Sequence, residues 1–238
     1  SLGRPRTLLE LNPALGGLLS VLVSFNGIWV ELIDYAGTVI GKAETKADVS
    51  SLDGPALCQA IVDTLATLPA ATQTPPWQLA VTAQGVTSAD NSRLLWSPIL
   101  LDDSLSFTDH LKEAFGCPVL VFNDTKMLAY DQWVEHGQDH PTFGVVLLSY
   151  GIGMGLYLNG ELFRGAASSG TEIGHMPYQR GGAKCRCGKL GCIEAYASDY
   201  ALWFPSGAPE QLESLAEIQF AINAPESAAP GDELDLSV

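Results

Sequence analysis

Three cysteines and one histidine in the second half of the chain have the types and the spacing of a metal site. His175, Cys185, Cys187 and Cys192 follow the pattern G-H-x9-C-x-C-x4-C in a glycine-rich segment. Three thiolates and one imidazole form a closed set of four donors, which suits a structural zinc ion. Because protein fills all four positions, no water site remains for hydrolysis, and we expect the ion to hold the loop in shape. The alternative is four reduced side chains without a common ligand.

Two acids flank this set, and the other two cysteines are isolated. Glu172 lies shortly before the histidine and Glu194 shortly after the last cysteine, so a metal-fixed loop would hold both, although either could be a surface acid. Cys58 and Cys117 have apolar neighbours in sequence, and we expect them to be core residues. The odd total of five cysteines disfavours a disulfide framework.

The composition is that of a soluble globular protein with one or two domains. The 238 residues are 47% hydrophobic, without an apolar run long enough to span a membrane. The opening residues 1–4 lack the pattern of a signal peptide, so we expect a cytoplasmic protein with no membrane partner. The net charge of -15 would repel a polyanion, and DNA binding would need another segment.

The elements that must position the candidate residues predict an α/β layer fold with a mixed sheet. The first half has the order β-β-β-α-β-α-β. The expected elements are two strands across residues 18–34 around an Asn26-Gly27 hairpin turn, a strand at 37–41, a helix at 54–68, a strand at 78–82, a helix at 107–115 ended by Gly116, and a strand at 118–122.

A second unit is expected from Asp124. Its pattern predicts a helix at 124–135, a strand at 143–148, a Gly-rich turn at 151–155 and a strand at 156–158. Residues 161–193 have no period, and long stretches of that kind in compact domains are usually functional.

The strings Glu172-Ile173-Gly174-His175 and Cys185 to Glu194 resemble the signature of the ROK family, which contains bacterial sugar kinases and sugar-responsive transcriptional repressors. Weaker similarity extends from about residue 4 to about residue 200. The resemblance implies a two-lobed actin/hexokinase-like (ribonuclease H-like) α/β fold with mixed sheets and a zinc-binding loop. Since 44 residues follow Glu194, fewer than the family usually has, we expect a shortened second lobe, either because the protein is naturally short or because this chain is a fragment.

The resemblance also implies domain boundaries. Residues 1–16 would be a connector from a DNA-binding domain outside this chain, and residues 17–123 the first lobe. Residues 124–223 would be the second lobe, with the zinc loop at 172–194. The acidic tail at 224–238 is expected to be solvated and disordered.

The resemblance assigns sugar contacts to five residues. Asn123 and Asp124 correspond to the family's sugar-contacting pair, whose aspartate is the general base in the kinases. Glu172, His175 and Glu194 correspond to further hydroxyl contacts, with the histidine using one ring nitrogen for zinc and the other for sugar. Carboxylates that accept hydrogen bonds suit neutral polyols. Asp124 could also be the N-cap of the following helix.

The nucleotide side departs from the family's kinases, which bind ATP through two Gly-rich phosphate loops. The acid and the Gly-Gly-Thr of the first loop are replaced by Leu22 and Ser24-Phe25-Asn26. The second loop begins with Ser149-Tyr150-Gly151 instead of Gly-Thr-Gly, although Gly151, Gly153 and Gly155 remain as a degenerate phosphate loop. Bulky side chains would obstruct the backbone amides that cradle a phosphate, so we expect no ATP or Mg²⁺ cofactor.

Further departures lie on the sugar side. Ile99 replaces an asparagine, Thr171 replaces a glycine, and Ala83-Gln84-Gly85 replaces a Val-Pro-Gly turn, so either the affinity or the identity of the ligand is expected to differ.

Three functions remain open from the sequence. The favoured one is a sugar-sensing effector domain of a ROK-family transcriptional regulator, without kinase activity, that binds a small carbohydrate and forms a homodimer or a higher homo-oligomer. The alternatives are an ATP-dependent sugar kinase for a hexose or N-acetylhexosamine, with Asp124 as general base, and a zinc-stabilised scaffold without a small ligand.

Overall fold

The computed structural model describes residues 11–69, 76–137, 139–166 and 169–203. Most of the predicted connector and the whole predicted tail at 224–238 lie outside these ranges. Within them, no helix is long and apolar enough to cross a bilayer.

The first unit is a five-stranded mixed sheet with the strand order β3-β2-β1-β4-β7. The first three strands form an antiparallel meander, and β4 and β7 join it in parallel. Two short strands, β5 and β6, form a separate hairpin. The bounds are β1 Gly17–Ser24, β2 Gly27–Asp34, β3 Val39–Lys46, β4 Pro76–Ala83, β5 Val86–Thr87, β6 Leu94–Trp96 and β7 Val119–Asn123.

Local sequence explains how the meander turns. The β1–β2 hairpin closes with Ser24 opposite Gly27, which confirms the predicted turn. The predicted strand at 37–41 is displaced, because β3 begins at Val39 and runs to Lys46. Asp34 Oδ1 accepts the N–H groups of Ala36 and Thr38 at 2.9 and 2.8 Å, which draws these residues into a turn.

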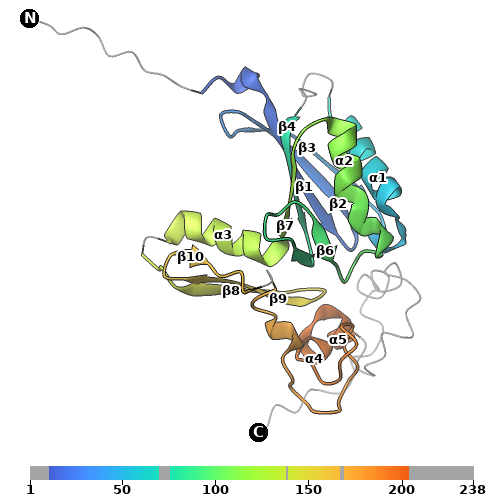
Figure 1. Cartoon of the computed structure of the whole chain (residues 1–238), viewed down its shortest axis with the longest axis vertical. Coiled ribbons are helices and arrows are strands. Elements are labelled where there is room, and N and C mark those ends of the chain that lie inside the picture. The colour runs from blue at the N-terminus through green and yellow to red at the C-terminus, as the bar shows by residue number, and fades with distance from the viewer. Residues whose placement is uncertain (1–10, 70–75, 138, 167–168, 204–238) are drawn as a thin grey trace, which may run out of the picture.

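Two helices, α1 Gly54–Ala66 and α2 Phe107–Phe115, cover one face of this sheet (Figure 1). The Asp53 carboxylate caps α1, and α2 ends at Gly116, whose φ of 63° is the left-handed conformation of a helix C-cap. The alternate residues of β1 and β4 that face the helices are buried. Cys58 lies in this core and Cys117 packs against it, as predicted.

The second unit is a three-stranded antiparallel sheet, β10-β9-β8, covered on one face by α3 (Figure 1). The bounds are α3 Asp124–His136, β8 Phe143–Leu148, β9 Ile152–Leu158 and β10 Glu161–Leu162. The short helices α4 Glu194–Ala197 and α5 Asp199–Trp203 follow the cysteine-bearing loop.

The prediction of a turn at 151–155 is wrong, because Ile152 to Gly155 belong to β9. The glycines serve close packing instead. A Cβ on Gly155 would lie 2.5 Å from Ala129 Cβ, and one on Gly153 would lie 2.5 Å from Thr125 Cγ2. Both contacts come from α3, so the glycines allow this helix to approach the sheet closely.

Candidate metal centre and ligand cavity

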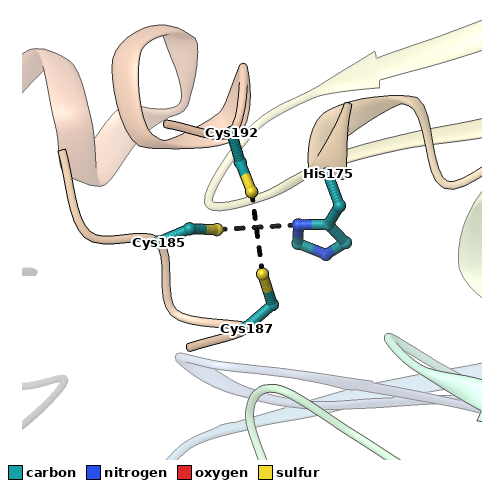
Figure 2. Close-up of side chains that lie close together, drawn as sticks. All are labelled: His175, Cys185, Cys187 and Cys192. Atoms are coloured by element: carbon teal, nitrogen blue, oxygen red, sulfur yellow. Dashed lines mark hydrogen bonds between the residues drawn. The ribbon is translucent and has the colours of Figure 1, made fainter. Parts of the chain in front are cut away.

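The four predicted metal ligands meet at one point (Figure 2). Their donor atoms all lie within 4.8 Å of one another. Cys185 Sγ lies 3.6 Å from His175 Nδ1, and Cys187 Sγ lies 3.7 Å from Cys192 Sγ. A tetrahedral zinc ion with bonds of about 2.3 Å to sulfur and about 2.0 Å to nitrogen gives edges of about 3.8 Å and about 3.5 Å. The donor set and its spacing therefore fit a tetrahedral divalent cation.

Short backbone turns bring the donors together. His175 ends a 3-10 turn at Ile173–His175, and the loop doubles back through a bridge between Pro177 and Cys192. The N–H of Gly188 donates to the Cys185 carbonyl at 2.9 Å, which closes the turn that carries two cysteines. Gly188 has a φ of 84°, a conformation that disfavours a side chain.

The surroundings of the thiols also suit a cation. Burial raises the pKa of Cys185 to about 12 and raises that of Cys192 as well. Buried thiols of this kind ionise only when a positive charge compensates them, and a bound divalent metal supplies it. With Nδ1 of His175 facing the cysteines, its Nε2 faces away from them (Figure 2).

A cavity of about 710 Å³, including its open mouth, lies between the two units. Its walls come from the ends of β4 and β7, the start of α3, the β5–β6 hairpin, β9 and the cysteine-bearing loop. The lining residues include Gln84, Val86, Trp96, Asn123, Asp124, Lys126, Tyr150, Gly151, Gly153, Glu172, Arg186 and Glu194.

Asn123 and Asp124 stand at the start of α3, where β7 ends. Asn123 is the N-cap of α3, and its Oδ1 accepts the Lys126 N–H at 3.0 Å. The alternative prediction that Asp124 is the N-cap is therefore wrong, because the cap is the preceding residue. Asp124 occupies the first helical position, and its Oδ1 accepts the N–H of Thr125 at 2.8 Å. Burial raises the pKa of Asp124, with a smaller contribution from the nearby Glu172.

The two predicted glutamates also line the cavity. Glu194 is buried, and its Oε2 accepts the Ile152 N–H at 3.0 Å, which links α4 to β9. Burial raises the pKa of Glu172, which lies close enough to His175 and Lys126 for their charges to act on it. His175 itself is not among the residues that line the cavity. Of the predicted phosphate-loop glycines, Gly151 and Gly153 line it, whereas Gly155 is buried against α3.

The lining residues that were not predicted as ligand contacts include Gln84, Lys126, Tyr150 and Arg186. Tyr150 is 1% exposed and stacks on Phe25, with ring centroids 4.5 Å apart and an interplanar angle of 15°. The Arg186 guanidinium lies 4.1 Å from the centre of the same ring. Phe25 and Arg186 cannot share one face of the Tyr150 ring, so the ring lies between them. The only feature of the sequence that pointed to this packing was the presence of two bulky residues, Phe25 and Tyr150, where the family's kinases have small ones.

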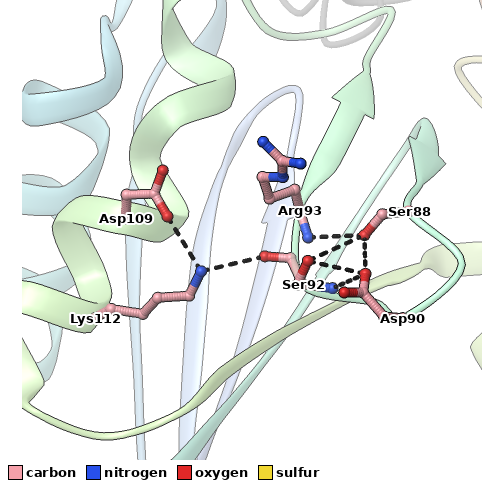
Figure 3. A network of polar contacts seen from close by, with 6 residues as sticks. All are labelled: Ser88, Asp90, Ser92, Arg93, Asp109 and Lys112. Carbon is pink, nitrogen blue, oxygen red and sulfur yellow. Dashed lines mark hydrogen bonds and ion pairs between the residues drawn. The ribbon is translucent and has the colours of Figure 1, made fainter.

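The β5–β6 hairpin closes one side of the cavity through Val86 and Trp96. Its tip is shaped by Asp90, whose Oδ1 accepts from Ser88 Oγ at 2.6 Å and Ser92 Oγ at 2.8 Å (Figure 3). These bonds lower the pKa of Asp90 to about 2. Arg164, which follows β10, donates to the Ala89 carbonyl at 3.4 Å, so the hairpin contacts the second unit.

Comparison with known proteins identifies relatives for this chain. The sequence model of the ROK family matches residues 30–230. The xylose repressor of Caldicellulosiruptor bescii is 27% identical over 206 residues, which are 84% of this chain and 51% of that protein. The chain thus spans about half the length of this curated relative.

Solved structures agree on the fold. A ROK family glucokinase from Streptomyces griseus, in complex with glucose and AMPPNP, matches with a TM-score of 0.66 and 25% identity over 79% of this chain and 59% of that chain. A ROK family transcriptional regulator, a homologue of the Escherichia coli Mlc protein, matches with a TM-score of 0.69 and 23% identity over 94% and 55%. These matches confirm the predicted actin/hexokinase-like α/β fold with mixed sheets.

Proposed function

This chain belongs to the ROK family, and we propose that it is the sugar-sensing effector domain of a transcriptional regulator and has no kinase activity. The observation that carries the proposal is the stack of Phe25 on Tyr150. These two side chains come from the two segments that correspond to the phosphate loops of the family's kinases.

The stack is unsuited to a nucleotide for a physical reason. Phosphoryl transfer depends on backbone amides and a metal ion that surround the phosphates closely. Here the Tyr150 ring stacks on the Phe25 ring and also contacts the Arg186 guanidinium in that region. The first segment also has Leu22 where the kinases have an acid. A nucleotide would have to displace these packed groups, so we expect neither ATP nor Mg²⁺ to bind.

The sugar side supports the sensing role. Four of the five predicted contacts line one cavity, and three of them are the carboxylates of Asp124, Glu172 and Glu194. Carboxylates that accept hydrogen bonds from adjacent hydroxyls bind a neutral polyol with directional specificity. In this proposal the metal centre holds a structural zinc ion, which fixes the loop that leads into Glu194. His175 binds the ion through Nδ1 and is given no sugar contact in this proposal, because it does not line the cavity.

The partners follow from the regulatory role. A DNA-binding domain outside this chain would carry the contact to DNA, because the charge of -15 opposes it here. A cytoplasmic homodimer, or a higher homo-oligomer, would convert closure around the sugar into altered DNA binding. The xylose repressor of C. bescii, which matches 84% of this chain, supports this regulatory role.

The test is calorimetric titration of the chain with pentoses, hexoses and N-acetylhexosamines, and separately with ATP and Mg²⁺. We expect heat from at least one sugar and none from ATP. No heat from any sugar would contradict the sensing role.

A second function, an ATP-dependent sugar kinase, is favoured by one observation. Asp124 lies in the cavity with a raised pKa, which is the property of a general base. Sugar-dependent ATP consumption that is lost in Asp124→Asn, and kept in the exposed Asp131→Asn on the same helix, would replace our proposal with this one.

A further inference from the structure

Gln84 has a position that the strand geometry fixes. It follows directly after β4, whose last residue, Ala83, is fully buried on the helix-covered face of the sheet. Because side chains alternate along a strand, Gln84 shares the opposite face with Thr82 and lies at the wall of the cavity. The next carbonyl, that of Gly85, accepts a hydrogen bond from Asn123 Nδ2 at 2.9 Å. The backbone around Gln84 is therefore held on both sides.

The side-chain oxygen of Gln84 is buried and accepts no hydrogen bond within the described ranges. The same ranges contain two other buried side-chain atoms without a partner, Thr108 Oγ1 and the Tyr150 hydroxyl. Buried polar groups are nearly always paired, because a desolvated acceptor without a donor is unfavourable. An unpaired acceptor on the wall of a cavity is satisfied when a ligand brings a donor.

The strand register places this acceptor beside the proposed sugar contacts. Ala83 of β4 pairs with Asn123 of β7, so the residues that follow them, Gln84 and Asp124, leave the sheet at the same edge. Both line the cavity. A carbohydrate whose hydroxyl contacts Asp124 would thus place a neighbouring hydroxyl or amide group near Gln84.

We propose that Gln84 is a specificity-determining contact, whose side-chain oxygen accepts a hydrogen bond from one hydroxyl or amide N–H of the bound carbohydrate. The inference rests on the proposed sugar-binding function and adds the feature that selects the sugar. Asp124, Glu172 and Glu194 are carboxylates that any polyol can satisfy with several hydroxyls. The neutral amide adds one short-range, directional contact, so it distinguishes sugars by whether a donor is present at one ring position.

The experiment measures binding to the whole chain by calorimetry. D-glucose, D-xylose and N-acetyl-D-mannosamine are titrated into the wild type, and the tightest binder is then replaced by its monodeoxyfluoro analogues. Fluorine keeps the size of a hydroxyl but removes the donor. The same series is measured for Gln84→Met, which keeps the length of the side chain without its acceptor. Gln59→Met, at an exposed glutamine on α1, is the matched control.

We expect Gln84→Met to weaken the tightest sugar roughly five- to tenfold, the usual effect of one lost hydrogen bond. One fluoro analogue should bind the wild type as weakly as the unmodified sugar binds Gln84→Met. The same analogue should bind the wild type and Gln84→Met with equal affinity, because the fluorine and the substitution remove the same contact. Gln59→Met should match the wild type. If Gln84→Met does not fold, Gln84→Ala, which cannot clash, carries the same expectation.

Two results would overturn the inference, and they are distinguishable. If the wild type binds a sugar and the Gln84 variants keep its affinity within twofold, with every analogue penalised as in the wild type, Gln84 is not a contact. If the wild type binds none of the three sugars, the proposed function itself fails and the inference falls with it.

Discussion

Single side chains in this protein act in sets, and the metal centre is the clearest case. Cys185 and Cys192 are buried, and burial raises the pKa of both thiols. Without a cation, four closely spaced donors have no shared partner. With one, each donor gains a bond that depends on the other three, so the loss of a single ligand should affect the whole loop.

The first prediction concerns Cys187→Ser. We expect the variant to lose a stoichiometric metal ion and its melting temperature to fall by about 6–12 °C, which corresponds to about 3 kcal/mol in a domain of this size. Elemental analysis and thermal denaturation check this. Cys117→Ala, outside the cluster, should retain the metal. A Cys187→Ser protein with unchanged melting would show that the cluster is not structural.

The second prediction concerns Asp124, whose pKa is raised by burial and by the nearby Glu172. Between the ordinary carboxyl pKa and this raised value, the folded state binds more protons than the unfolded state, so stability falls as the pH rises through that window. Asp124→Asn keeps the oxygen that accepts the Thr125 N–H but cannot ionise. We therefore expect it to melt higher than the wild type at pH 7 and to lose part of the decline in melting temperature above pH 4.

The exposed Asp131 provides the control for that measurement, since Asp131→Asn changes the same charge on the same helix. It should leave the pH dependence of melting unchanged. Equal melting temperatures of Asp124→Asn and the wild type at every pH would contradict the burial argument.

Packing at the level of elements is clearest where α3 meets β9. The buried Gly155 lies against Thr125 and Ala129, and β8, the neighbouring strand, has its own glycine at Gly144. The added Cβ would meet helix backbone at Gly155, but only the flexible end of Met154 at the exposed Gly144. The two positions have the same chemistry and different neighbours.

The third prediction uses that pair. Gly155→Ala should destabilise the protein by about 1–3 kcal/mol, because the helix must move away from the sheet. Gly144→Ala should change stability by less than about 0.5 kcal/mol. Denaturant unfolding of both variants measures the difference. Similar values for the two would mean that the helix approach is not tight.

Strand β9 illustrates which features could be predicted from the sequence and which could not. Strands and helices with clear periodicity, such as residues 54–66, were predicted to within a few residues. The gathering of His175 and the three cysteines into one cluster that could hold a metal ion was predicted from type and spacing alone. The glycines at 151–155 indicated a turn because local propensity was the only information available. Their use against α3 depends on a contact between segments distant in sequence, as does the burial of Gln84 Oε1.

The two units of the molecule are connected by a column of side chains. Phe25 comes from the β1–β2 hairpin, Tyr150 from the β8–β9 turn, and Arg186 from the metal loop between two predicted ligands. Arg186 Nη2 also donates to the Pro98 carbonyl of the first unit at 3.4 Å. The metal loop therefore contacts the first unit through Arg186, a residue whose backbone the metal would fix.

The fourth prediction follows from this dependence. Arg186→Met removes the contact with the Tyr150 ring and should cost the metal-loaded protein about 1–2 kcal/mol of unfolding free energy, the range for a desolvated cation–π pair. After metal removal, Cys185 and Cys187 no longer hold the guanidinium over the ring, so the same substitution should cost less than about 0.5 kcal/mol. Arg180→Met, at an exposed position of the same loop, should be neutral in both states. Denaturant unfolding with and without chelator measures the change in unfolding free energy for each of the two variants in each metal state. An equal cost of Arg186→Met in the two states would mean that the metal does not position the column.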